Sequence, residues 1–147
     1  MRMQPHDMAK YHAFTHYVRV DMPAVGSNGK IMEAIQYASY YSLSDAKLRE
    51  ALQWGSGPLI KVVPKQRGLE YGSHPKWSDI LEVGQWMVED FERGRGAIIY
   101  CGVYEIGVTL LHELTHWADE GDGSREADKY GGEIGWFFER RAYQNEK

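Results

Sequence analysis

The 147-residue sequence contains a single cysteine, Cys101, and this scarcity excludes two kinds of site. One cysteine cannot form an intrachain disulfide, and it cannot assemble a cysteine-based metal site. Cys101 ends an apolar, strand-like run over residues 97–101, so we interpret it as a small buried side chain and not as a catalytic thiol. A metal site in this chain would therefore use histidine and carboxylate ligands.

Long apolar runs and clusters of positive charge are also missing. No stretch of about 20 apolar residues is present, so we expect no membrane span. The first seven residues lack the apolar core of a signal peptide, so action outside the producing cell would require a separate carrier. The net charge is −4 and the lysines and arginines are not clustered, so we expect no nucleic-acid partner.

The remaining composition is that of an ordinary globular protein. Hydrophobic residues make up 43% of the chain and charged residues 26%. The length is sufficient for one hydrophobic core, so we expect a single domain over residues 1–147. Within it, we expect residues 1–25 to be irregular or flexible, apart from a strand at residues 17–20.

Helices and short strands alternate along the rest of the chain. Ser44 is a typical N-cap for a helix over residues 45–54, which the Gly-rich turn at Gly55 ends. The other expected elements are helices over residues 31–41, 85–93, 105–119, 125–130 and 133–144, and strands over 59–63, 80–83 and 98–101, with a polar loop at 64–77. This order predicts an α+β fold with several helices and a small β-sheet.

One motif indicates a specific chemistry. Residues 112–116 read His-Glu-Leu-Thr-His, and they lie in an apolar-rich segment, residues 108–118, with the periodicity of a half-buried helix. Residues four apart share a helix face, so His112 and His116 can direct two imidazole nitrogens at one zinc ion. Glu113 lies beside them, where it can take a proton from a metal-bound water. The competing interpretation is two hydrogen-bonded core histidines beside a surface glutamate.

A catalytic zinc ion usually has three protein ligands, so the motif requires a third. The metzincin extension, H-E-x-x-H-x-x-G-x-x-H, would place that ligand at Asp122. Asp119 occupies the position of the metzincin glycine, which disfavours this arrangement because the chain must turn sharply there. The other arrangement takes a glutamate from a second helix, and Glu126, Glu133 and Glu139 follow the motif.

Spacing favours Glu139 as the third ligand. Its neighbours at −4 and +3 on a helix are Gly135 and Ala142, which leave room for an ion and a facing helix. Glu126 is so close to the preceding break that the chain has little room to turn back. Glu133, at the start of the last helix, is the alternative ligand. The competing interpretation of Glu139 is a solvated residue paired with a neighbouring arginine.

Other polar side chains are candidates for supporting roles. Asp119 shares a helix face with His112 and His116 and is a candidate to hold one of them by its second ring nitrogen. Pairing of Asp119 with Arg125 at the helix end is an equal alternative. The candidates to donate a hydrogen bond to a developing oxyanion are Tyr143, Tyr130 and His74, and the sequence does not choose among them.

A second pair of histidines, His12 and His16, is also spaced by four residues. No carboxylate accompanies this pair, and Arg19 is close. We therefore interpret both as ordinary surface histidines.

The motif and the last helix together resemble a known family. Residues 112–119, followed after a Gly-rich gap by residues 132–135 and 138–143, resemble the metallopeptidase toxin domains of bacterial polymorphic toxins. Those domains lie at the C-termini of Rhs and spike proteins exported by type VI secretion. The resemblance implies a zincin-like domain whose third zinc ligand is the glutamate of the Phe-Glu step, Glu139.

The resemblance also implies an activity and partners. It implies a zinc metallopeptidase, an antibacterial effector domain, with Zn²⁺ as cofactor and Glu113 as general base. A peptide or protein is the expected substrate, an immunity protein and a secretion-system carrier are the expected partners, and delivery into a target cell is the expected route. Two alternatives stay open: a zinc amidase or other hydrolase, and a non-catalytic metal-binding module.

Overall fold

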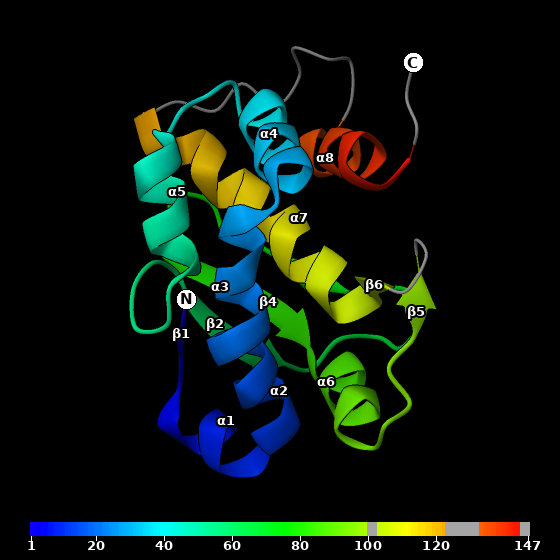
Figure 1. Ribbon diagram of the computed structural model, residues 1–147. Coiled ribbons are helices and arrows are strands. Elements are labelled where there is room, and N and C mark those ends of the chain that lie inside the picture. Colours follow the sequence, from blue (N-terminus) through cyan, green and yellow to red (C-terminus); the bar gives the residue numbers. More distant parts are fainter. Residues whose placement is uncertain (100–102, 123–132, 145–147) are drawn as a thin grey trace.

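A small mixed β-sheet supports the motif helix in the computed structural model, which describes residues 1–99, 103–122 and 133–144 (Figure 1). The strand order is β1-β2-β4-β3. Three strands are parallel, namely β1 (Arg2–Met3), β2 (Leu59–Val63) and β4 (Ile80–Gly84), and β3 (Gly72–Ser73) lies antiparallel to β4 at the edge. A separate antiparallel pair joins β5 (Ile98–Ile99) to β6 (Val103–Tyr104).

Helices connect β1 to β2 and follow β4. The α-helices are α1 (Pro5–Lys10), α2 (His12–His16), α3 (Met22–Ala24), α4 (Gly29–Ala38), α5 (Asp45–Leu52), α6 (Gln85–Glu92), α7 (Glu105–Asp119) and α8 (Ile134–Tyr143). A π-helical turn, η1 (Tyr17–Asp21), and two 3-10 turns, η2 (Val25–Ser27) and η3 (Glu120–Asp122), complete the described elements. The fold is therefore α+β, as the sequence predicts.

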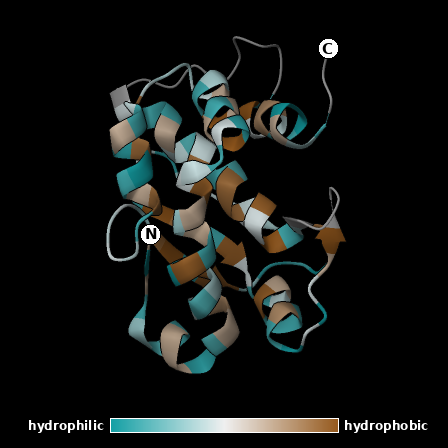
Figure 2. Ribbon diagram, in the orientation of Figure 1, coloured by the Kyte–Doolittle hydropathy of each residue, from teal (hydrophilic) through white to brown (hydrophobic). Residues whose placement is uncertain are grey.

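The motif helix α7 is central in this arrangement. It packs on β3 and β4 on one side and on α4 and α8 on the other, with α4 and α8 side by side (Figure 1). Leu110, Leu114 and Ala118 of α7 are fully or almost fully buried. Figure 2 shows hydrophobic residues on α7 and on the sheet beneath it. Enclosure on both sides explains why so much of this helix is apolar.

The N-terminal part of the chain differs from its prediction. Residues 17–20, expected as a strand, form the π-helical turn η1, and helical elements cover most of the segment expected to be irregular. The burial explains the difference, since Phe14, Val18 and Met22 are fully buried and spaced by four residues. That spacing places them on one face of a helix, so packing overrides the alternating pattern of residues 17–20.

Several other predictions are confirmed within one to three residues. The strand at 59–63 and the motif helix at 105–119 have the predicted bounds, and the Ser44 side chain accepts a hydrogen bond from the Lys47 amide as an N-cap does. Helix α4 begins earlier than expected because Asn28 caps it. The loop at 64–77 contains the short strand β3, which the sequence did not reveal. The helical piece predicted at 125–130 lies outside the described residues.

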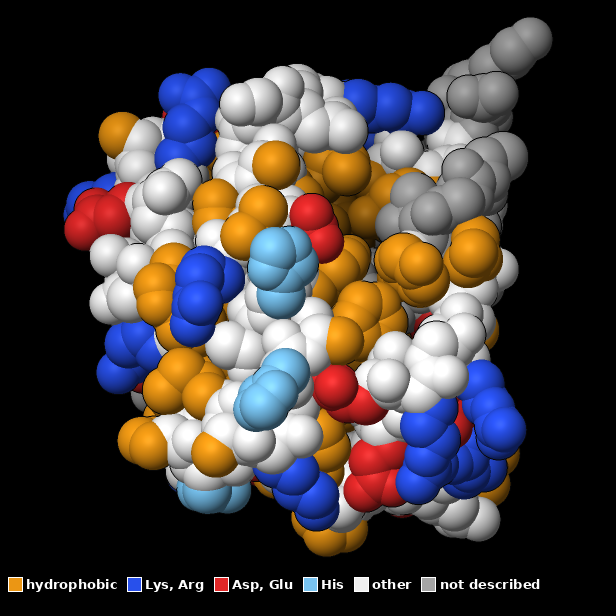
Figure 3. Space-filling view, turned by 60° about the horizontal axis from the view of Figure 1, so that its bottom comes forward, with side chains coloured by type: hydrophobic (Ala, Val, Ile, Leu, Met, Phe, Trp, Pro, Cys, Tyr) orange, Lys and Arg blue, Asp and Glu red, His pale blue; other side chains and the backbone are white. Residues whose placement is uncertain are grey.

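The molecular surface carries charges of both signs. On the face shown in Figure 3, lysine and arginine side chains are interspersed with aspartate and glutamate. Among the described residues, no helix has the length and apolar character needed to cross a membrane.

Candidate metal centre

The motif side chains lie together on α7. His112, Glu113 and His116 each offer one ligand atom, and these atoms lie within 4.8 Å of one another. The two imidazole rings are 5.4 Å apart between centroids, as expected for residues one helical turn apart. Their side chains keep exposed fractions of 17% and 13%, whereas Glu113 is buried. The helix thus places two accessible imidazoles beside a buried carboxylate.

Two glycines allow other elements to approach these side chains closely. A Cβ atom on Gly135, in the first turn of α8, would overlap the imidazole of His112. A Cβ atom on Gly72, in β3, would lie 2.7 Å from the Glu82 carbonyl oxygen, 2.9 Å from Cγ2 of Thr109 and 3.4 Å from Cγ of Glu113. Gly135 is therefore restricted to glycine by its short distance to α7, and Gly72 by its short distances to the β4 backbone and to α7.

Glu133 connects the start of α8 to both histidines. It is the N-cap residue of α8, and its carboxylate accepts hydrogen bonds from the backbone amides of Gly135 at 2.9 Å and Trp136 at 3.2 Å. The same carboxylate contacts Nε2 of His112 at 3.1 Å and also contacts Nε2 of His116. The cap thus directs a carboxylate at the point where the two imidazoles converge.

Glu139 contacts the opposite nitrogen of His112. Its Oε1 atom lies 2.6 Å from Nδ1 of His112. The ligand favoured by spacing therefore faces Nδ1, and the alternative, Glu133, faces Nε2 of both histidines. Glu139 and Glu133 therefore lie at opposite nitrogens of the His112 ring. The sequence alone did not show this difference.

The electrostatics of this cluster favour positive charge at its centre. Burial opposes an imidazolium at His112, but the hydrogen-bonded carboxylates of Glu133 and Glu139 outweigh it and raise the pKa of His112 to about 10. Burial likewise opposes ionisation of Glu133, but its bonds to His112 and His116 lower its pKa overall. Burial raises the pKa of Glu113. A divalent cation between these groups would satisfy the same charges.

The donor set suits zinc. Two imidazole Nε2 atoms converge on one carboxylate, and a second carboxylate, Glu139, holds the other nitrogen of a histidine. Imidazole nitrogens and carboxylate oxygens are common zinc ligands, and ligating histidines usually bond a carboxylate or carbonyl through their second nitrogen. The residues present therefore fit the group that the motif implies.

A large cleft opens beside the metal centre. It has a volume of about 700 Å³ and is bordered by β3, by the segment before β3, by α7 and by the first turns of α8. Apolar and charged side chains both line it, and they include His112, Glu113, Glu139, Glu105, Lys65 and Trp136. Because Glu113 is at its wall, a polypeptide in the cleft would pass the motif.

The remaining candidates are placed as follows. Asp119 is buried at the last residue of α7, and its proposed bond to a histidine stays a prediction. The Tyr143 ring packs edge-on against Phe138, and its role as an oxyanion donor also stays a prediction. His12 and His16 are exposed, as predicted. The side chain of Asp122, together with Cys101, Arg125, Glu126 and Tyr130, lies outside the described residues.

His74 has a role that sequence reasoning missed. Its side chain is 1% exposed, Nδ1 lies 2.8 Å from the Ile80 carbonyl oxygen, and Nε2 contacts the carboxylate of Glu120. Glu120 also accepts a hydrogen bond from the Trp77 amide at 2.5 Å. Both ring nitrogens are thus engaged: Nδ1 joins the β3–β4 loop to β4, and Nε2 joins it to η3, which follows α7.

Comparison with known families agrees with this geometry. Residues 7–144 match the family described as Metallopeptidase toxin 3. The chain belongs to this family. A metallopeptidase toxin of this family is a hydrolase that acts on protein. The match covers the first half of this chain as well as the part that carries the motif. No curated protein and no solved structure matches the chain.

Proposed function

We propose that this metallopeptidase toxin domain is a zinc-dependent peptidase in which Glu113 is the general base. The observation that carries the proposal is the convergence of His112 and His116 on one carboxylate, directly beside buried Glu113 and at the wall of a large cleft. We further propose that the third ligand is Glu133, because its carboxylate faces Nε2 of both histidines.

A zinc ion held by these residues would lower the pKa of a water molecule towards about 7 and polarise the carbonyl of the bond to be cut. Glu113 would accept the proton of that water as it attacks and later give the proton to the leaving amine. Burial raises the pKa of Glu113, which brings its proton affinity closer to that needed for such a transfer. The reaction consumes one water and breaks one amide bond.

Glu139 would act through His112. Its 2.6 Å contact with Nδ1 fixes the ring orientation and the tautomer, so that Nε2 is directed at the ion. The alternative assignment, with Glu139 as the third ligand, requires its carboxylate to face the ion and not Nδ1. The observed contacts support the first assignment.

The first test removes the proposed general base, Glu113. Glu113→Gln should lower peptide cleavage by about 100- to 10,000-fold and leave one zinc per chain, because Glu113 is not a ligand in this proposal. Glu50→Gln, which removes a carboxylate from the exposed side of α5, is the matched control and should behave as wild type. Full cleavage by the Glu113 variant would reject the mechanism. Cleavage of other amides or esters but of no peptide would replace the peptidase with another zinc hydrolase.

The second test separates the two glutamates. Glu133→Gln should abolish stable zinc binding, whereas Glu139→Gln should weaken it by about 10- to 100-fold, the usual effect of removing a residue that supports a ligand. Zinc affinities from competition with a chelating dye would measure both. Retention of tight zinc binding by the Glu133 variant, with loss in the Glu139 variant, would make Glu139 the ligand.

We also propose that a carrier delivers this domain to a target cell and that an immunity protein restrains it there. Family membership as a toxin supports delivery. Expression of the domain in the cytoplasm and, with an added signal peptide, in the periplasm of a bacterium should show toxicity in at least one compartment. The Glu113→Gln variant should be harmless in both. Equal toxicity of the variant would separate the toxic effect from peptide hydrolysis.

A further inference from the structure

The cleft beside the metal centre contains more carboxylates than the proposed reaction uses. Four glutamates line it: Glu70, Glu105, Glu113 and Glu139. Glu113 and Glu139 have the roles given above. Glu70 and Glu105 have no role in holding an ion or moving a proton, so their charge is available to a substrate.

Positive charge in the cleft is already compensated. Lys65 is the one lysine or arginine among the described residues that line it. Its Nζ atom lies 3.1 Å from Oγ of Ser73 and 3.9 Å from Oε1 of Glu82, and the Ser73 hydroxyl donates to the same Glu82 oxygen at 2.6 Å. Lys65 therefore pairs with Glu82, and it does not neutralise the glutamates that line the cleft.

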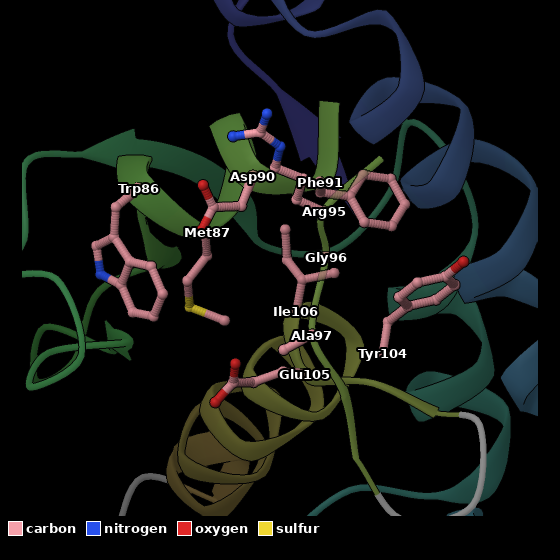
Figure 4. Close-up of a pocket in the computed structure, with 10 residues that line it drawn as sticks. All are labelled: Trp86, Met87, Asp90, Phe91, Arg95, Gly96, Ala97, Tyr104, Glu105 and Ile106. Carbon is pink, nitrogen blue, oxygen red and sulfur yellow. The ribbon is translucent and has the colours of Figure 1, made fainter. Parts of the chain in front are cut away.

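Of these two carboxylates, Glu70 accepts a hydrogen bond from the Gln66 amide at 3.2 Å, whereas Glu105 has no such bond to the described residues. It is the first residue of α7 and is half-buried, and its side chain makes no hydrogen bond or ion pair with the residues that the structure describes. Arg95 lines a small neighbouring pocket with Glu105, but Figure 4 shows its guanidinium at the far side, towards Asp90. Burial, and secondly the charge of Glu139, raise the pKa of Glu105. A cation beside Glu105 would stabilise its ionised carboxylate and so oppose both of these influences on its pKa.

The distance from Glu105 to the motif defines where such a cation would lie on a substrate. Glu105 precedes His112 by seven residues, which is about 10 Å along the helix axis. An extended peptide advances about 3.3 Å per residue, so this distance corresponds to about three residues. Thr109 lies between them on the same wall of the cleft.

The apolar rim of the cleft suits the rest of a basic side chain. Trp136 and Leu69 both line the cleft and are 63% and 69% exposed. Lysine and arginine bury their aliphatic stems on apolar surface while the charged end reaches a polar group, and an indole face attracts a cation. An apolar rim with an uncompensated carboxylate in its wall therefore matches a basic side chain better than a purely apolar or acidic one.

We propose that this cleft selects polypeptides that carry a lysine or arginine within about three residues of the cleaved bond, and that Glu105 is the residue that determines this specificity. The inference rests on the proposed peptidase function. A carboxylate in the first turn of a helix also stabilises the helix dipole, and that role affects stability but not the choice of substrate.

The experiment begins with the wild-type, zinc-loaded domain and a peptide library made by digesting a bacterial proteome at glutamate. Mass spectrometry of the cleaved library gives the residues around each cleaved bond. One good cleavage sequence is then made as three peptides that differ at one position, with Lys, Met or Glu there. We expect the Lys peptide to have a kcat/KM about tenfold above the Met peptide.

Substitutions at Glu105 test whether this residue determines the preference for a basic side chain. Glu105→Gln should lower kcat/KM for the Lys peptide about tenfold and leave the Met peptide nearly unchanged, and Glu105→Lys should make the Glu peptide the preferred one. Glu50→Gln is the matched control and should keep the wild-type order. Thermal unfolding and zinc content of each variant show whether the fold and the metal centre persist.

The outcomes separate this inference from the function on which it rests. If the zinc-loaded wild type cleaves no peptide, the proposed function fails and the inference with it. If it cleaves peptides without enrichment of Lys or Arg near the bond, only the inference is overturned. Equal loss for all three peptides in Glu105→Gln, with an intact fold, would likewise overturn the role of Glu105.

Discussion

The Arg141 guanidinium donates hydrogen bonds to both carboxylate oxygens of Glu33, with nitrogen–oxygen distances of 2.6 to 3.0 Å. It also lies 3.8 Å from the centroid of the Tyr37 ring. Arg141 is on α8, two residues after Glu139, whereas Glu33 and Tyr37 are on α4. This contact thus holds α8 against α4. Helix α8 carries Glu139, and Glu133 caps it.

Arg141→Ala should therefore weaken the metal centre more than it weakens the fold. The paired side chains are 38% and 44% exposed, so the ion pair contributes only about 0.5 kcal/mol to the free energy of unfolding. We expect zinc affinity to fall severalfold, because α8 loses part of its attachment. The control is Arg93→Ala, which removes an ion pair between the C-cap residue of α6 and Glu89. Equal zinc affinity in both variants would contradict this role.

The same ion pair predicts a dependence of stability on pH. The hydrogen bond from Arg141 is the main cause that lowers the pKa of Glu33 below its ordinary value. A lowered folded-state pKa means that the stabilisation is present above the unfolded pKa, about 4.3, and is lost as pH falls through the lower folded value. Unfolding of wild type and Glu33→Gln at pH 7 and at pH 3 should therefore show a small difference that shrinks in acid. A difference that grows in acid would contradict the sign.

The sequence predicted the motif helix well because local and long-range preferences agree there. An apolar run without Gly or Pro, with His112 and His116 one turn apart, indicates the helix regardless of its neighbours. The strand expected at residues 17–20 is wrong for the opposite reason. Its alternation is local, whereas the burial of Phe14, Val18 and Met22 at a spacing of four depends on packing against the rest of the domain.

The second half of the site was harder to predict. Both Glu133 and Glu139 were candidates, but their positions depend on where α8 begins and how close it approaches α7. The spacing of residues along the sequence does not give the distance between α8 and α7. Glu133 directly before Ile134 is compatible with an N-cap, and Gly135 permits the close approach, but only the packing shows that the capping carboxylate also faces His116.

Zinc binding should release protons at a pH where a free histidine would release few. The carboxylates of Glu133 and Glu139 outweigh burial and raise the pKa of His112 to about 10 in the metal-free protein, so His112 carries a proton at pH 7.5. A ligating imidazole must lose it, so affinity should fall as pH falls below about 10. Calorimetry in two buffers of different ionisation enthalpy should give at least about one proton per zinc, against about 0.1 for a histidine of pKa about 6.5. A release near 0.1 would contradict the raised pKa.

Gly135→Ala should damage the metal centre through a single methyl group. The added Cβ would overlap the His112 imidazole, so either the ring or the start of α8 must move. Since Glu133 caps α8 two residues before this position, both moves disturb contacts around Nε2 of His112. We expect zinc affinity to fall at least tenfold, measured by chelator competition. Gly29→Ala in α4 is the matched control, because nothing lies within 4 Å of its added Cβ. Unchanged zinc affinity in the Gly135 variant would show that α8 approaches α7 less closely than described.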